Sequence, residues 1–155
     1  GVFKSTDRGN NWTQINNGLD SLETNILTVD PNDSETLYLG TDDDGVYKST
    51  DGGESWKKLT VSSLSKSFGV GDIIVDPQNS NNIYIGTVDY FRLSESRGVL
   101  GDFGVYKSTD GGATWEEFNV GLNHLGVFSL ELSEENRILY AGTRAGGVYW
   151  ISLDN

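Results

Sequence analysis

One short phrase is written three times in this chain of 155 residues. It occupies residues 1–12, 45–56 and 104–115, and an incomplete fourth start covers residues 147–150. Each copy of such a repeat is one supersecondary unit that needs neighbours to bury its apolar face. The repeat therefore constrains the architecture of the chain far more than its activity.

Two other recurring segments precede the phrase and have the composition of strands. Residues 25–31, 72–77 and, more loosely, 128–132 form one set, and residues 36–41, 82–87 and 138–143 form the other. Both sets are rich in β-branched and aromatic residues and are bounded by turn formers. Proline and Asx residues at 30–34 and 76–80 predict the turns between them. One unit is thus expected to hold four strands, at about 26–30, 37–41, 45–49 and 56–59.

Four antiparallel strands per unit predict an all-β fold, the β-propeller with four-stranded blades. Residues 1–155 contain about three and a quarter such blades, whereas a closed ring commonly has four to eight. We therefore expect a partial propeller domain, either a fragment from the C-terminal part of a larger ring or a chain that self-associates to close one. Its remaining blades are expected to come from the parent chain or from other copies.

Composition excludes several classes of function. A formal net charge of −12 disfavours a nucleic-acid partner, because phosphates would be repelled over most of the surface. The absence of cysteine rules out disulfides and thiolate metal sites. No apolar run approaches the roughly 18 residues of a membrane-spanning helix. We expect no nucleic acid, no membrane span, no metal and no cofactor.

The phrase Ser-x-Asp-x-Gly-x-x-Trp resembles the Asp box, or BNR repeat, of sialidases and their relatives. The segments around it are similar to those of xyloglucanase-type glycoside hydrolases, sortilin-type receptor propellers and photosystem assembly factors. This resemblance implies a propeller fold and a secreted or extracytoplasmic location, and it covers both enzymes and non-enzymes. The boxes lie at 5–12, 49–56 and 108–115, with the pattern carried by Ser5, Asp7, Gly9, Trp12, Ser49, Asp51, Gly53, Trp56, Ser108, Asp110, Gly112 and Trp115.

The repeated aspartates Asp7, Asp51 and Asp110 favour a structural role over catalysis. A short carboxylate in a tight turn accepts hydrogen bonds from its own loop, and glycine supplies the positive φ. Each tryptophan is then expected to cover the apolar layer of its blade. The resemblance likewise implies that the boxes lie on the face opposite the active site.

Loops that join the second strand to the third, or one unit to the next, share the other end of the sheets, which we call the binding face. Between Thr87 and Gly104 this face carries sixteen residues, where the two equivalent loops have three. Functional residues concentrate in such insertions. The insertion at 88–103 mixes aromatic rings suited to sugars with guanidinium groups suited to carboxylates. Its candidate residues are Asp89, Tyr90, Phe91, Arg92, Glu95, Arg97, Asp102 and Phe103.

Neighbouring loops of the binding face add three consecutive aspartates at 42–44, together with His124 and Arg144. The aspartates lack the alternate spacing and distal glutamate of a calcium loop, so a solvated acidic turn is favoured over a Ca²⁺ site. A lone histidine makes no metal cluster, and we expect His124 at the surface.

These patterns favour a non-catalytic module that recognises a glycan or protein partner through its binding face. The ligand-binding residues would be Tyr90, Phe91, Arg92, Arg97 and Arg144. The alternative is a fragment of a glycoside hydrolase of the xyloglucanase or sialidase type. Such an enzyme needs two carboxylates flanking the scissile bond, and Asp89, Glu95 and Asp102 are the candidates.

Overall fold

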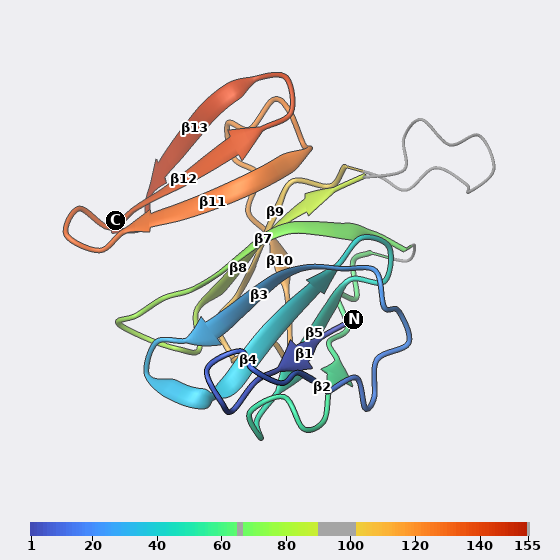
Figure 1. Ribbon diagram of the computed structural model, residues 1–155. Helices are drawn as coiled ribbons and strands as arrows, with labels where there is room; N and C mark the ends of the chain where they lie inside the picture. The colour runs from blue at the N-terminus through green and yellow to red at the C-terminus, as the bar shows by residue number, and fades with distance from the viewer. Residues whose placement is uncertain (65–66, 90–101, 155) are drawn as a thin grey trace.

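The computed structural model of this chain describes residues 1–64, 67–89 and 102–154. Within those residues, thirteen strands form four antiparallel sheets (Figure 1). Sheet 1 pairs β1 (Phe3–Lys4) with β2 (Thr13–Gln14). Sheet 2 has the order β3 (Thr24–Asp30), β4 (Asp33–Thr41), β5 (Val46–Ser49) and β6 (Lys57–Lys58). Sheet 3 has the order β7 (Gly69–Val75), β8 (Ile83–Val88), β9 (Val105–Ser108) and β10 (Glu116–Glu117). Sheet 4 contains β11 (Val127–Ser133), β12 (Ile138–Thr143) and β13 (Gly147–Ser152).

The all-β, blade-like architecture expected from the repeats is confirmed. Each repeat unit forms one sheet, and its strands follow one another in chain order. One boundary differs from expectation, since β4 begins at Asp33 inside the segment expected to be a turn. Asp30 pairs directly with Asp33 across a register shift, so this connection is tighter than the sequence suggested. In the part of the chain that the structure describes, no helix is long and apolar enough to cross a membrane.

Consecutive sheets stack face to face and bury three apolar cores. The core between sheets 2 and 3 is built around Tyr38, Val70 and Ile85. Its close packing depends on glycine, because a Cβ atom at Gly40 would lie 2.8 Å from the Cβ of Val70. Gly86 occupies the equivalent place between sheets 3 and 4. The Tyr-x-Gly-Thr segment therefore places a glycine where the next sheet packs too closely for a side chain.

The loops divide between two ends of the sheets as expected. At the binding face, the Gly45 amide donates to Phe68 O at 3.0 Å, and the Gly104 amide donates to Leu125 O at 2.9 Å. At the opposite face the Asp-box turns bond to the connection between the first and second strands, as in the 3.0 Å bond from the Gly111 amide to Asn81 O, or to the start of the second strand, as in the 2.9 Å bond from the Gly52 amide to Glu35 O. Figure 1 shows the turns β3–β4, β7–β8 and β11–β12 gathered at this opposite end.

The expectation that every box tryptophan covers an apolar layer is wrong for Trp12. Trp56 and Trp115 are 5% and 7% exposed, whereas Trp12 is 62% exposed. Trp56 is buried because it packs against the preceding sheet, where its Nε1 donates to Ile15 O at 2.9 Å. Trp12 belongs to sheet 1, which has no preceding sheet within the described residues. The exposure of a box tryptophan is thus decided by its neighbouring blade.

Candidate ligand-binding face

Three loops of the binding face are closed at their base by the same hydrogen bond, which we call the threonine neck. A threonine hydroxyl at the end of each second strand donates to the carbonyl of the glycine that opens the third. These Oγ1–O distances are 3.0 Å for Thr41 to Gly45, 2.9 Å for Thr87 to Gly104 and 3.0 Å for Thr143 to Gly147. The long insertion is consequently anchored on the same hairpin geometry as the three-residue loops.

The described ends of the insertion are tied to the neighbouring loop of sheet 4. The Asp89 amide donates to Asp102 Oδ1 at 2.8 Å, which holds the two ends of the insertion together. Arg144 Nη2 donates to Asp89 O at 2.5 Å, and the guanidinium lies 5.1 Å from the ring centroid of Phe128. Arg144 therefore reaches from the loop of sheet 4 to the base of the insertion.

A hollow lies between these loops, and its walls mix donors with acceptors. The Asp102 carboxylate is half-buried there, while the His124 and Arg144 side chains are exposed. A concave surface that offers both donors and acceptors suits a ligand rich in hydroxyl groups. The lining residues are Asp102, Asn123, His124, Leu125, Gly126, Arg144 and Ala145.

The candidate site residues predicted from the sequence differ in their exposure and in whether they line the hollow. His124 is exposed, as expected, and Arg144 and Asp102 line one hollow. Asp89 is only 2% exposed, so its carboxyl group lies beneath the surface. Phe103 is half-buried and packs against the core between sheets 2 and 3. The other candidates of the insertion lie outside the described residues: Tyr90, Phe91, Arg92, Glu95 and Arg97. Sequence analysis missed Asn123 and Phe128, and the only signal for them was their position beside His124 and at the start of a strand.

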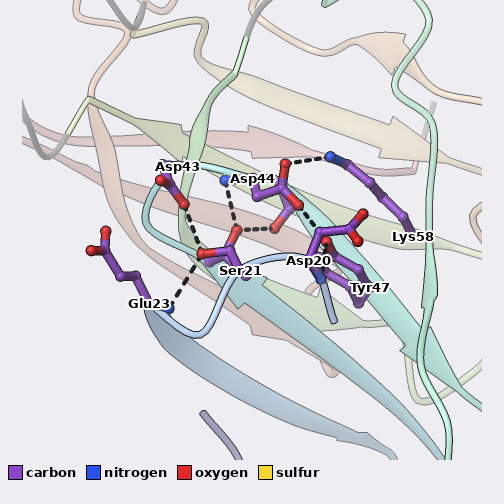
Figure 2. Close-up of polar contacts among 9 residues, drawn as sticks. Asp20, Ser21, Glu23, Asp43, Asp44, Tyr47 and Lys58 are labelled. Atoms are coloured by element: carbon purple, nitrogen blue, oxygen red, sulfur yellow. Dashed lines mark hydrogen bonds and ion pairs between the residues drawn. The ribbon is translucent and has the colours of Figure 1, made fainter. Parts of the chain in front are cut away.

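The acidic turn at 42–44 is braced by protein donors. Figure 2 shows Ser21 Oγ donating to Asp43 Oδ1, a distance of 2.9 Å. The Tyr47 hydroxyl and the Lys58 ammonium both bind the Asp44 carboxylate (Figure 2). Across the described residues, no group of three or more His, Cys, Asp or Glu side chains is arranged to hold a metal ion. The contacts of Asp43 and Asp44 are those of a hydrogen-bonded loop on the binding face.

Burial raises the pKa values of Asp42, in this loop, and of Tyr47, in the adjoining strand β5. It raises the pKa of Asp42 above its usual value, and the charges of Glu23 and Asp43 add to the effect. Burial, together with the hydrogen bond to Asp44, raises the pKa of Tyr47 to about 12. Tyr47 therefore keeps its proton at neutral pH and acts as the hydrogen-bond donor to Asp44.

On the opposite face, both carboxylate oxygens of each box aspartate accept hydrogen bonds from residues of its own turn. Asp110 Oδ1 accepts from Ser108 Oγ and from the Thr114 amide, both at 2.8 Å, and Oδ2 accepts from Thr114 Oγ1 at 2.5 Å. Asp51 has equivalent partners in Ser49 and Ser55. The pKa of Asp51 is lowered to about 2, chiefly by the hydrogen bond from the Ser55 side chain. The pKa of Asp110 is also lowered to about 2, chiefly by the hydrogen bond from the Thr114 side chain. The same pattern of bonds around Asp7 lowers its pKa as well, led by the Asn11 side chain.

The family model Sortilin-Vps10, described as sortilin, neurotensin receptor 3, matches residues 1–150. The chain belongs to the Sortilin-Vps10 family. This Sortilin-Vps10 chain is also similar to the xyloglucanase Xgh74A of Acetivibrio thermocellus, with 36% identity over 96 residues. That match covers 56% of the chain and 11% of the xyloglucanase.

Two solved structures have similar folds over 97% of the chain. One is an ancestral GH74 enzyme, with a TM-score of 0.76 and 25% identity. The other is a GH74 enzyme of Niastella koreensis, with a TM-score of 0.67 and 27% identity. The chain spans 20% and 24% of these two proteins, respectively. It thus corresponds to a small part of each relative.

Proposed function

We propose that this Sortilin-Vps10 chain is a segment of an extracytoplasmic propeller glycoside hydrolase that acts on a polysaccharide of the xyloglucan type. The observation that carries the proposal is the likeness to GH74 enzymes over 97% of the chain, together with 36% identity to a xyloglucanase. In this proposal the segment supplies part of the substrate-binding face, and further blades of a longer protein supply the rest.

The hollow beside the insertion has the chemistry that a neutral sugar requires. Arg144 and His124 offer donors, and the Asp102 carboxylate offers acceptors, so the hydroxyl groups of one sugar ring could be bound from several sides. The guanidinium of Arg144 is already oriented by Asp89 O and by the Phe128 ring. Such preorganisation lowers the entropic cost of binding.

If this segment contributes a catalytic carboxyl group, Asp102 is a better candidate than Asp89. Glycoside hydrolysis needs two carboxyl groups flanking the bond, about 5 to 10 Å apart. Asp102 reaches the surface hollow, whereas the Asp89 side chain is buried. We propose that Asp102 faces the substrate and that its partner carboxylate lies in another part of the longer protein.

Titration of this chain with xyloglucan oligosaccharides, followed by calorimetry, tests the binding role. We expect saturable binding that His124→Ala and Arg144→Ala each weaken by tenfold or more. Glu54→Gln, on the opposite face, is the matched control and should bind as the unmodified chain does. Absence of binding, or equal weakening by the control, would contradict the proposed site.

A second candidate is a recognition module without chemistry, which the receptor named in the matched family model favours. The two functions separate in the longer protein. If the segment takes part in hydrolysis, Asp102→Asn abolishes turnover and leaves oligosaccharide binding in place. If the segment is a recognition module, the unmodified protein shows binding and no turnover to lose.

A further inference from the structure

Two lysine side chains lie directly opposite each other in sheet 2. The register pairs Lys48 of β5 with Lys57 of β6, so both side chains are on the same face of the sheet. The equivalent lysines lie opposite Thr13 in sheet 1 and Glu116 in sheet 3. Like charges opposite each other destabilise a pair of strands. Sheet 2 therefore carries a local repulsion that the equivalent pairs of sheets 1 and 3 do not have.

A cavity of about 530 Å³ adjoins this pair of lysines at the face opposite the binding face. Both lysines line it together with Leu59, and the Asp-box turn of sheet 3, at residues 110–113, forms the facing wall. Thr50 and Ser55 add hydroxyl groups to the lining. The cavity, which we call the box cavity, thus combines positive charge, hydroxyl groups and apolar surface.

The space between sheets 1 and 2 has the same construction and provides a comparison. There Lys4 Nζ donates to Gly52 O at 3.0 Å, just as Lys48 Nζ donates to Gly111 O at 3.2 Å in the box cavity. Each lysine thus reaches across to the box turn of the next sheet. The residues around the two lysines can therefore be compared position by position.

Two positions that line the box cavity are more positive than their equivalents between sheets 1 and 2. Ala113 stands in the box turn of sheet 3 where Glu54 stands in that of sheet 2. Lys57 stands in sheet 2 where sheet 1 has Thr13. One exchange removes a carboxylate and the other adds an ammonium group, so both favour a bound anion.

A third exchange removes the carboxylate beside the lysine that reaches across. Glu35 Oε2 lies 2.7 Å, and Lys4 Nζ 3.3 Å, from the Cβ position of Gly52. The neutral Asn81 takes the place of Glu35 beside Lys48, and its carbonyl likewise accepts from the box glycine amide. All three exchanges make the box cavity more positive, although the chain has a net charge of −12.

Asp110 has the only carboxylate among the described residues that line the box cavity, and it is already hydrogen-bonded. Its Oδ1 accepts from Ser108 Oγ and the Thr114 amide, and its Oδ2 accepts from Thr114 Oγ1. The Lys48 ammonium has three N–H groups, of which the box turn accepts one, and Lys57 is exposed. Both ammonium groups therefore have donors left for an anion.

The main chain of the facing turn is also occupied. The Gly111 amide donates to Asn81 O, and the Gly112 amide donates to Ser108 Oγ. Gly112 O accepts from Trp115 Nε1 at 3.1 Å. A peptide that binds through its main chain would find few partners here, whereas hydroxyl and ammonium groups remain for a sugar that carries an acid group.

We propose that the box cavity binds an acidic sugar residue, whose carboxylate or sulfate group lies between Lys48 and Lys57. Charge-assisted hydrogen bonds from both ammonium groups hold the anion and offset the repulsion between them. The hydroxyl groups of the sugar bond to Thr50 and Ser55, and its apolar face packs on Leu59. This site lies on the other face from the hollow of the binding face, so it does not depend on the function proposed above.

Calorimetric titration of the chain with trigalacturonic acid at low ionic strength tests the site. Lys57→Thr and Ala113→Glu each introduce the residue found at the equivalent position, where the fold accepts it. We expect saturable binding that Lys57→Thr weakens about fivefold and Ala113→Glu about tenfold or more. Lys58→Thr is the matched control, since the register places Lys58 opposite Tyr47 on the other face of sheet 2, and it should leave the affinity unchanged. Circular dichroism checks that each variant folds.

A sulfated galactotriose identifies which acid group is preferred, and binding of either acidic sugar that both variants weaken supports the proposal. Equal binding of neutral galactotriose, equal weakening by Lys58→Thr, or absence of binding by both acidic sugars would overturn it. A glutamate-rich peptide that binds where the acidic sugars do not would overturn the ligand class. His124→Ala should not change these affinities, so a loss in that variant would put the ligand on the binding face and overturn the location.

Discussion

Sheets 3 and 4 are built from the same strand pattern, yet their outer faces have opposite environments. Val105 is 3% exposed because sheet 4 covers it, whereas the equivalent Val148 is 71% exposed. A Cβ atom at Gly86 would lie 2.7 Å from Val127 of the next sheet, but at Gly142 it would meet only Ser129 of its own sheet. The repeat therefore specifies a face that is ready for packing, and the next blade decides whether that face is buried.

The largest difference in unfolding free energy is expected between two variants that place a carboxylate on the outer face of sheet 3 or of sheet 4. Val105→Asp buries an unpaired carboxylate and should destabilise the chain by more than about 4 kcal/mol. Val148→Asp leaves its carboxylate in water and should change stability by less than about 0.5 kcal/mol. Urea unfolding of the two variants measures both effects. Equal losses would mean that the outer face of sheet 4 is covered in solution.

The box tryptophans provide the second test of the comparison. Trp115→Ala removes a side chain that is 7% exposed and should cost about 3–5 kcal/mol. Trp12→Ala removes one that is 62% exposed and should cost no more than about 0.5 kcal/mol. Thermal unfolding monitored by circular dichroism compares them. A loss at Trp12 as large as that at Trp115 would contradict the assignment of sheet 1 as an uncovered edge.

The contact between sheets 3 and 4 also depends on one buried ion pair. Arg137 donates to Asp76 through Nη1 at 3.0 Å and through Nη2 at 2.6 Å, and the Asp76 side chain is 1% exposed. Arg137→Ala should cost about 3 kcal/mol at neutral pH, because it leaves a buried carboxylate without its partner. Urea unfolding at neutral pH gives this value.

The pH dependence of that variant tests the cause. Burial alone would raise the pKa of Asp76, but bonds from Arg137, the Gln78 amide and Asn82 outweigh it and lower the pKa. The pair therefore stabilises the fold above the usual aspartate pKa, and the contribution is lost as pH falls through the lowered value. In Arg137→Ala we expect burial to raise that pKa above its usual value, so the deficit should begin to shrink as pH falls through the raised value. A deficit that stays constant with pH would exclude the buried charge as its cause.

The smallest difference in unfolding free energy is expected at the equivalent glycines Gly86 and Gly142, of which only Gly86 faces a neighbouring sheet among the described residues. Gly86→Ala pushes against Val127 across the interface and should cost about 1–3 kcal/mol. Gly142→Ala meets only the Ser129 hydroxyl, which can rotate away, so its cost should be smaller. Unfolding by guanidinium resolves the two, and a reversed order would argue against the close approach of sheets 3 and 4.

The strands were predictable from sequence because each has a local composition and ends at turn residues. The order of four strands in a sheet followed from the repeat. The sequence also showed that the fourth copy of the phrase is incomplete, since only its start is present at residues 147–150. Trp12 was wrongly expected to be buried because its motif is intact. Burial depends on a neighbouring sheet that the motif does not encode.

The site was less predictable than the fold. The bond from Arg144 to Asp89 O joins loops 55 positions apart, and no local pattern links them. The insertion was singled out by its length and by its mixture of aromatic, arginine and acidic residues, but Tyr90, Phe91, Arg92 and Arg97 lie outside the described residues. The threonine necks were present in the sequence as Gly-Thr pairs, but only the structure shows that they hold long and short loops alike.

An experimental structure of the longer protein proposed above tests most directly the claim that the outer face of sheet 4 is ready for packing. We expect Val148 and Trp150, which are 71% and 67% exposed in this chain, to be buried there against another antiparallel sheet. Exposure of both side chains in that structure would contradict the account.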